Sequence, residues 1–319
     1  MRGVWVNILI TGYSGFLGTH LLSRISDEHK VTLVGRSKPT QNGFKYVHAQ
    51  LNKEFNFSSS LLGCDVVIHA AARVHVMSEK ESDPLSVFRE LNTHATIKLA
   101  TQAAEAGVKR FIFISSIKVN GESTTGRRPF SVQDDRAPED PYGISKAEAE
   151  EQLLHISRDT GMEVVIIRPP LVYGEGGKGN FSSLMNFVKK GYPLPFRCIK
   201  SNKRSFVSVY NLVDLINVCI NHAKAANQVF LVSDNHDLST AEMVALMATV
   251  QDKTNFTLPI PLWCYKIAGK VLNKKDVVER LIGSLQVDVS HTMDTLDWKP
   301  PYSLEAGFKL AAKGKSLGK

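Results

Sequence analysis

Paired cysteines, clustered histidines and long apolar runs are all missing from this 319-residue sequence. None of the four cysteines has the paired spacing typical of a zinc site or a disulfide framework. The ten histidines form no HExxH motif or other ligand-spaced cluster, so nothing indicates a metal centre. No apolar stretch approaches the roughly 18 residues of a membrane-spanning helix, and the N-terminal VWVNILI lacks a signal-peptide cleavage site. These absences predict a cytoplasmic protein with no membrane span and no metal.

Acidic residues are fewer than basic ones, and the formal net charge is +8. Proteins that bind nucleic acid usually gather their cations on one face. Here lysine and arginine are spread along the chain and interleaved with acids. We therefore expect a solvated surface that keeps a few cations for an anionic ligand, and no nucleic-acid partner.

Short runs rich in valine, isoleucine and leucine alternate with longer amphipathic stretches. Unbroken apolar character, as in DVVIHAAA, is typical of parallel strands that are covered on both faces. The stretch 83–107 has helical periodicity and stops at Gly107. The sequence therefore predicts an α/β fold, a Rossmann-like doubly wound parallel sheet. Its predicted strands are residues 4–10, 31–34, 65–69, 110–115 and 163–168.

The amino-acid composition changes after residue 174, where glycine, proline and polar residues become frequent before the apolar run RSFVSVYNLVDLI. This change predicts two domains. The dinucleotide-binding domain would comprise residues 1–174 with a return segment at 204–234. A smaller C-terminal substrate-binding domain would comprise residues 175–203 and 235–319.

A glycine-rich turn, TGYSGFLG, follows the first predicted strand and opens a helix. Glycines let backbone amides approach a pyrophosphate, and the positive end of the helix dipole favours that anion. The pattern also fits a plain strand-to-helix turn. Read functionally, it predicts a dinucleotide site at Gly12, Gly15, Phe16, Leu17 and Gly18.

The second predicted strand ends in Gly35 and Arg36, without an acidic residue. An acid at this point would accept hydrogen bonds from the adenosine ribose and repel a 2′-phosphate. The guanidinium of Arg36 instead suits phosphate oxygens, which favours NADP(H) and leaves NAD(H) possible. The alternative is that Arg36 only caps a strand at the surface.

The motif PYGISK places Tyr142 and Lys146 four residues apart, so on a helix both project from one face. A lysine ammonium beside a phenol lowers the pKa of the phenol and makes it a usable proton donor or acceptor. At the end of an earlier strand, Ser115 and Ser116 offer a hydroxyl that could hold a reacting oxygen. This order of motifs predicts a hydride-transfer site.

With these motifs in place, the chain resembles the extended short-chain dehydrogenase/reductases, specifically their nucleotide-sugar epimerase/dehydratase group. The resemblance covers nearly the whole chain and rests on TGYSGFLG, VIHAAA, ELNTHAT, FISSIKVNGE, PYGISK and RPPLVYGEG. It implies a catalytic set of Ser116, Tyr142 and Lys146, together with Asn92 at the family's helix asparagine. It also implies cofactor contacts from Tyr142, Lys146, Ala70, Ala71 and Ala72.

The same resemblance implies a UDP-sugar substrate and a homodimer. Arg204 matches an arginine that contacts the diphosphate of the sugar nucleotide, and Arg280 and Asn180 are further substrate-binding predictions. Each position also has a plainer interpretation. Arg204 could be an exposed strand-edge charge, Arg280 a solvated helix residue, and Asn92 a hydrogen-bonded helix amide.

The choice of reaction depends on a few positions. The family's dehydratases carry an Asp-Glu pair after the catalytic hydroxyl residue, whereas this chain has Ile117 and Lys118, so elimination of water is not expected. Val74 and Leu171 stand where UDP-galactose 4-epimerases typically carry Lys and Asn.

A reductase exchanges its cofactor each turnover, which suits selection for NADPH by Arg36. The segments AARVHVM and SSIKVNGE also resemble the family's O-antigen branch, which implies 4-keto reduction of a UDP-6-deoxy-amino sugar in O-antigen or polysaccharide precursor synthesis. The alternative is a UDP-hexose (glucose or N-acetylglucosamine) 4-epimerase with tightly bound NAD. A remote alternative is a non-catalytic dinucleotide-binding sensor.

Overall fold

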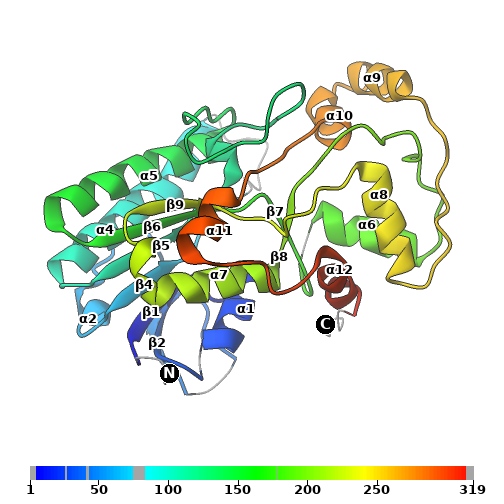
Figure 1. Cartoon of the computed structure of the whole chain (residues 1–319). Coiled ribbons are helices and arrows are strands. Elements are labelled where there is room, and N and C mark those ends of the chain that lie inside the picture. The colour runs from blue at the N-terminus through cyan, green and yellow to red at the C-terminus, as the bar shows by residue number, and fades with distance from the viewer. Residues whose placement is uncertain (1–4, 26, 41–42, 75–82, 178, 314–319) are drawn as a thin grey trace.

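The computed structural model describes residues 5–25, 27–40, 43–74, 83–177 and 179–313, so residue 4 of the first predicted strand lies outside it. In these ranges one sheet has seven parallel strands in the order β3-β2-β1-β4-β5-β6-β9 (Figure 1). The strands are β1 Asn7–Thr11, β2 Lys30–Gly35, β3 Lys45–His48, β4 Val66–His69, β5 Arg110–Ile114, β6 Glu163–Arg168 and β9 Gln228–Leu231.

The strand order reverses beside β1, since β2 and β3 lie on one side of it and β4 on the other. In doubly wound sheets, ligands bind at the carboxyl ends of the strands where this reversal occurs. Every residue of β4 and β5 is buried, as expected for central strands covered on both faces. The predicted fold class is confirmed.

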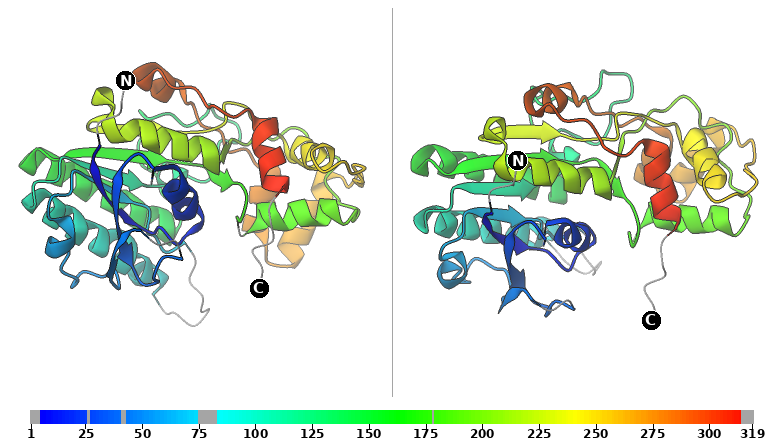
Figure 2. Two further views of the ribbon diagram at one scale, coloured as in Figure 1. Left: turned by 90° about the horizontal axis from the view of Figure 1, so that it is seen from below. Right: turned by 60° about the horizontal axis from the view of Figure 1, so that its bottom comes forward.

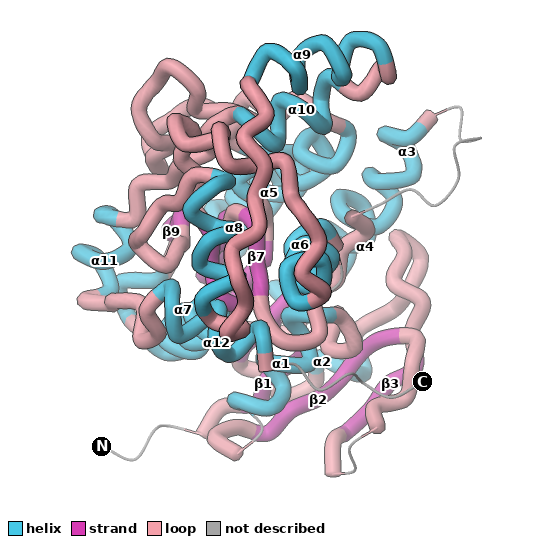
Figure 3. The backbone as a smooth tube through the Cα atoms, turned by 90° about the vertical axis from the view of Figure 1, so that its right-hand side faces the viewer, coloured by secondary structure: helices cyan, strands magenta, loops and turns pink. Residues whose placement is uncertain are grey.

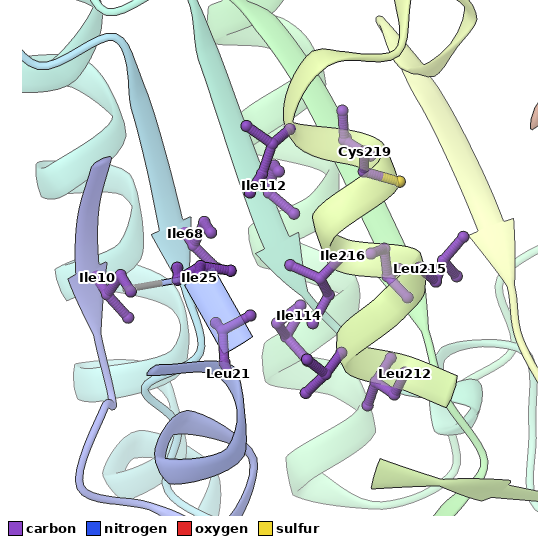
Figure 4. Packing of buried hydrophobic residues seen from close by; sticks show 14 of the residues in the cluster. Ile10, Leu21, Ile25, Ile68, Ile112, Ile114, Leu212, Leu215, Ile216 and Cys219 are labelled. Carbon is purple, nitrogen blue, oxygen red and sulfur yellow. The ribbon is translucent and has the colours of Figure 1, made fainter. Parts of the chain in front are cut away.

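Helices cover both faces of this sheet. One face carries α1 (Phe16–Ile25) and α7 (Val209–Asn221), whose apolar side chains point toward the isoleucines of the sheet (Figure 4). The other face carries α2 (Ser58–Leu61), α4 (Ala95–Glu105) and α5 (Pro141–Thr160). The two apolar layers hold the carboxyl ends of the strands in fixed positions.

The predicted helix at 83–107 is divided into three segments. Asp83 caps α3 (Pro84–Arg89), residues Glu90–His94 form a π-helical turn, and α4 follows. A π-helical turn inserts one residue into a helix and is frequent at functional sites. Here it contains Asn92.

A smaller region lies at one end of the sheet (Figure 2). Its two parallel strands are β7 (Leu171–Tyr173) and β8 (Phe206–Ser208). The helices α6 (Asn180–Lys189), α8 (Thr240–Thr249) and α12 (Leu304–Ala312) pack around Tyr173, Phe181 and Phe308. Short 3-10 turns occur at Ile117–Val119 and Ala223–Ala225.

The chain between α8 and α12 contains α9 (Leu262–Val271), α10 (Lys275–Ile282) and α11 (Ser290–Leu296). The first two stand at the edge of the smaller region, whereas α11 packs beside β9, and Trp298 enters the core of the large sheet (Figure 3). The predicted boundary, which puts 235–319 in the smaller domain, stays a prediction. Within the described residues, no helix combines the length and the apolar character that crossing a bilayer requires.

Candidate active site

The glycine-rich turn between β1 and α1 is packed tightly on its protein side. Gly12 has φ +76°, and a Cβ there would lie 2.4 Å from the backbone nitrogen of Ala71. A Cβ on Gly18 would lie 2.1 Å from the carbonyl oxygen of Gly12. Gly15 is exposed, and its nearest such neighbour is 3.2 Å away. The turn is therefore closed toward the sheet and open at Gly15.

The open side of the turn presents backbone groups that can bind the pyrophosphate of a dinucleotide. The first N–H groups of α1, from Phe16 onward, have no partner inside the helix, and the dipole favours an anion there. No acidic residue stands in that first turn. The backbone of Ala70 and Ala71, at the end of β4, closes on Gly12 from the neighbouring strand. The residues present fit the pyrophosphate and ribose of NAD(P).

Arg36 is exposed just past the end of β2. A Cβ on its neighbour Gly35 would lie 3.0 Å from the ring of Tyr13, and the Tyr13 hydroxyl donates to the carbonyl oxygen of Ser37. The absence of a side chain at residue 35 is thus explained by packing against Tyr13, without any 2′-phosphate. This role of Tyr13, inside the glycine motif itself, was not predicted from the sequence.

Ser116 and Tyr142 come together at the carboxyl end of β5. Ser116 begins the 3-10 turn, where its Oγ accepts from the backbone N–H of Lys118 at 3.3 Å and hydrogen-bonds with Tyr142. Tyr142 is the second residue of α5, and the helix cap Asp140 accepts from the N–H of Gly143 at 2.6 Å. The cap fixes the phenol against the serine.

Burial raises the pKa of Tyr142 to about 12, the charge of Asp140 adds to this effect, and the hydrogen bond to Ser116 opposes it. Burial also lowers the pKa of Lys146 to about 7. Lys146 Nζ donates to the carbonyl oxygen of Ile114 at 2.8 Å and lies 4.3 Å from the ring centroid of Phe113. The expected lowering of the phenol pKa by the lysine is therefore wrong, because burial disfavours the charged amine, whose Nζ donates to the Ile114 carbonyl oxygen.

Asn92 is wholly buried and fully hydrogen-bonded to the protein. Its amide nitrogen donates to the carbonyl oxygen of Arg73 and to Ser145 Oγ, both at 3.0 Å, and its oxygen accepts from the N–H of Arg73 at 2.8 Å. These partners favour the plainer interpretation of Asn92. The side chain joins the loop after β4 to α5 and so positions the site.

Sequence reasoning missed a buried network under α5. Arg168 pairs with Glu150, with Nε 2.9 Å from Oε1, and also donates to Asn120 Oδ1 at 3.0 Å. Ser115 Oγ donates to the same Glu150 carboxylate at 2.5 Å. A glutamate four residues after Lys146 on the same helix face was the available signal.

A cavity of about 590 Å³ lies in the smaller region and is lined by Asn180, Arg204 and Arg280. The fourth predicted substrate-binding residue, Ser116, does not line it. Burial and then the charge of Arg280 lower the pKa of Arg204, whose guanidinium donates to the carbonyl oxygen of Arg280 at 2.9 Å. Two cations held close together in a largely apolar cavity form a site suited to a polyanion.

A second cavity, of about 740 Å³, shares Arg280 with the first and reaches Lys118, Glu122 and Asp140 beside the serine and the phenol. Lys118 Nζ pairs with Glu122 at 2.8 Å and with Asp140. Ile117 is buried in an apolar cluster. The two cavities thus meet at Arg280, and the second reaches Lys118 and Asp140, each two residues from Ser116 or Tyr142 in the chain.

The comparisons with known proteins agree with this geometry. The NAD dependent epimerase/dehydratase family matches residues 8–233. A UDP-glucose 4-epimerase of Vibrio cholerae is 54% identical over 310 residues, 96% of this chain and 94% of that protein. An N-acetyl-α-D-glucosaminyl-diphospho-ditrans,octacis-undecaprenol 4-epimerase of Escherichia coli O157:H7 is 26% identical over 94% of this chain and 92% of its own length.

Solved structures share the fold. The Bordetella bronchiseptica enzyme WbmG in complex with NAD superposes with a TM-score of 0.75 at 20% identity, covering 98% of this chain and 94% of that one. A Thermotoga maritima UDP-glucose 4-epimerase with UDP-glucose gives a TM-score of 0.77 at 22% identity, covering 96% and 97%. None of these findings supports a preference for NADP.

Proposed function

This chain belongs to the NAD dependent epimerase/dehydratase family, and on that premise we propose that it is a UDP-hexose 4-epimerase that keeps NAD bound throughout turnover. The observation that carries the proposal is 54% identity to a UDP-glucose 4-epimerase over 96% of the chain. The contact between Ser116 and Tyr142 and the two cavities that share Arg280 support it.

The epimerase replaces 4-keto reduction as the preferred reaction. The reductase reading depended on Arg36 as a phosphate ligand, and an exposed arginine beyond β2 fits a surface role equally well. Of the two departures from galactose epimerases, Val74 is exposed and Leu171 lines the 590 Å³ cavity. The homodimer and the cytoplasmic location stay predictions.

In the proposed reaction, Arg204 and Arg280 bind the diphosphate, and the apolar lining with Phe187 and Phe196 accommodates the base. The hexose then extends toward Ser116 and Tyr142. When bound, NAD supplies a reversible hydride acceptor and a positive charge. The residues that fit it are the glycine turn, the loop after β4 and Lys146.

Proton transfer falls to Tyr142. Its phenolic oxygen takes the proton from the hydroxyl at sugar C4 and later returns it, while Ser116 Oγ holds the same oxygen by a hydrogen bond. A phenol with a pKa of about 12 holds its proton at neutral pH, so it acts only when a positive charge stabilises the phenolate. Lys146 Nζ donates to the carbonyl oxygen of Ile114 and so helps to fix the carboxyl end of β5, where Ser116 lies.

The test is interconversion of UDP-glucose and UDP-galactose by purified protein with no added cofactor, followed by denaturation and identification of the released dinucleotide as NAD. Tyr142→Phe should lose roughly 10²- to 10⁴-fold in kcat while retaining NAD. Oxidation of NADPH with a UDP-4-keto-6-deoxy sugar, without interconversion of UDP-hexoses, would instead establish the reductase. Retained dinucleotide with no turnover of either substrate would indicate the sensor.

A further inference from the structure

The helices α9 and α10 form a hairpin that packs on itself more than on the rest of the molecule (Figures 1 and 3). Gly269 is the one buried residue of α9, and α10 has none. A Cβ on Gly269 would lie 2.8 Å from Val278 Cγ2, so the two helices approach closely at this glycine. The outer side of the hairpin is left without a protein partner among the described residues.

Large apolar side chains line that outer side. Trp263, Ile267 and Val271 stand four residues apart on α9 and are 63%, 54% and 76% exposed. Spacing of four residues places them on one face of the helix. Leu272, just beyond α9, is also exposed. A contiguous exposed apolar stripe of this kind marks an interaction surface.

Lysines accompany the stripe. Lys266 and Lys270 each follow an apolar member by three residues, whereas Lys274 precedes α10 and Lys275 begins it. In the part of the chain that the structure describes, none of these four lysines forms an ion pair. The stripe is therefore both apolar and cationic.

The acids of the hairpin point elsewhere. Asp276 and Glu279 line the 740 Å³ cavity, where they face Lys118 and the loop after the catalytic serine. Lys266 and Arg280 line the same cavity, so the inner side carries both signs of charge, whereas Lys270, Lys274 and Lys275 lie outside that cavity with the apolar stripe. This polarity determines what can cover the outer side.

We propose that the α9–α10 hairpin docks on the anionic surface of a phospholipid membrane. Lysine ammonium groups on long stems reach lipid phosphates while Trp263 and Ile267 enter the interfacial layer, the arrangement of an interfacial amphipathic helix. A second copy fits less well, because a twofold contact through this face would bring the lysines of both chains together. Closure over the substrate cavity would leave the stripe outside, since the cavity lies on the inner side of the hairpin.

The docking bears on the substrate site, because α10 contributes Arg280 to both cavities. A hairpin lying on lipid would hold the sugar-nucleotide cavities within about one helix diameter, ~10 Å, of the membrane surface. The proposal does not depend on which sugar is epimerised.

The experiment is co-sedimentation of the full-length protein with vesicles of phosphatidylcholine alone or with added phosphatidylglycerol. Binding is expected only with the anionic lipid and should weaken as salt is raised. The triple variant Trp263→Ser/Ile267→Ser/Val271→Ser should abolish it. Lys270→Gln/Lys274→Gln should weaken it about 25-fold, at about fivefold per lysine.

Matched controls are Leu62→Ser, which removes an exposed leucine on the opposite side of the molecule, and Lys53→Gln/Lys224→Gln, which removes two exposed lysines elsewhere. Both should bind vesicles as the parent does. All variants should keep the parent's thermal transition and its turnover of a UDP-hexose in solution, so the docking and the epimerase proposals can fail separately.

Three results would overturn the proposal. The first is absence of binding, or equal binding to neutral vesicles. The second is vesicle binding that the hairpin variants leave unchanged. The third is concentration-dependent self-association, measured by sedimentation velocity, that the triple variant alone abolishes, because the stripe would then be a contact between copies of the chain.

Discussion

The three glycines of the turn after β1 do different work. Gly12 and Gly18 are packed against backbone atoms, whereas Gly15 is exposed at the open side of the turn. Gly18→Ala should lower the free energy of unfolding by about 1–3 kcal/mol, because the added methyl overlaps the Gly12 carbonyl. Gly15→Ala should leave unfolding within about 1 kcal/mol of the parent and reduce the NAD that copurifies.

Urea denaturation and the dinucleotide content of the purified protein measure the two effects. Equal losses of stability in both variants would contradict this separation of roles.

Lys146 makes stability depend on pH. Its pKa is lowered to about 7 by burial, so between about pH 7 and 10.5 the unfolded chain binds more protons than the folded one. The free energy of unfolding should therefore rise with pH in this window, by up to about 1.4 kcal/mol per pH unit. Lys146→Met should remove this rise, as measured by urea denaturation at pH 7, 8 and 9. A rise of the same slope in the variant would show that other groups cause it.

The sequence predicted the residue types of the site better than it predicted their protonation states. The spacing of Tyr142 and Lys146 predicted one helix face, and the structure places both on α5. The direction of their pKa shifts depends on burial and on the Ile114 carbonyl, which only the folded chain brings there. Gly35 and Arg36 were interpreted as a phosphate site from their local sequence alone. In the folded chain Gly35 packs against Tyr13, which lies 22 residues earlier, and local sequence does not reveal this contact.

At the scale of elements, α5 is held by more than its apolar face. Asp140 caps its start, Gly161 ends it at φ +76°, and the Glu150–Arg168 pair joins its middle to the end of β6. Both partners of this pair are buried. Because Tyr142 and Lys146 lie on this helix, the pair also fixes the candidate active site.

Arg168→Met should lower the free energy of unfolding by about 3–5 kcal/mol, because it leaves the Glu150 carboxylate buried without its cation. The double variant Arg168→Met/Glu150→Met should recover most of this loss. Urea denaturation of the parent, both single variants and the double variant measures the coupling. If the double variant is as unstable as the sum of the singles, the two residues act independently.

The central elements were predictable and the peripheral ones were not. Runs such as RFIFI are apolar because they are buried on both faces, so composition alone indicates β5. The pairing of β7 with β8 joins segments more than 30 residues apart that have only three residues each, too short for a periodic signal. The π-helical turn at Glu90–His94 likewise has no pattern of its own.

At the scale of the whole molecule, the proposed substrate bridges two regions. Arg280 belongs to α10 at the far side of the cavities, whereas the serine and the phenol lie at the large sheet. Arg280→Gln should raise KM for UDP-glucose roughly 10- to 100-fold, the range for loss of a charged hydrogen bond, with kcat and bound NAD nearly unchanged. Lys253→Gln, in the same region but outside both cavities, is the control for steady-state kinetics. A fall in kcat without a change in KM would place Arg280 at the reacting centre.

The return of the chain to the large sheet has a consequence for biosynthesis. The face that presents Ile112 and Ile114 is covered by α7, and Trp298 joins the same core much later in the sequence. A ribosome makes the strand first and its cover about 100 residues afterwards. The growing chain therefore leaves an apolar sheet face uncovered for much of its synthesis, and such a face is prone to aggregation until its covering helix is made.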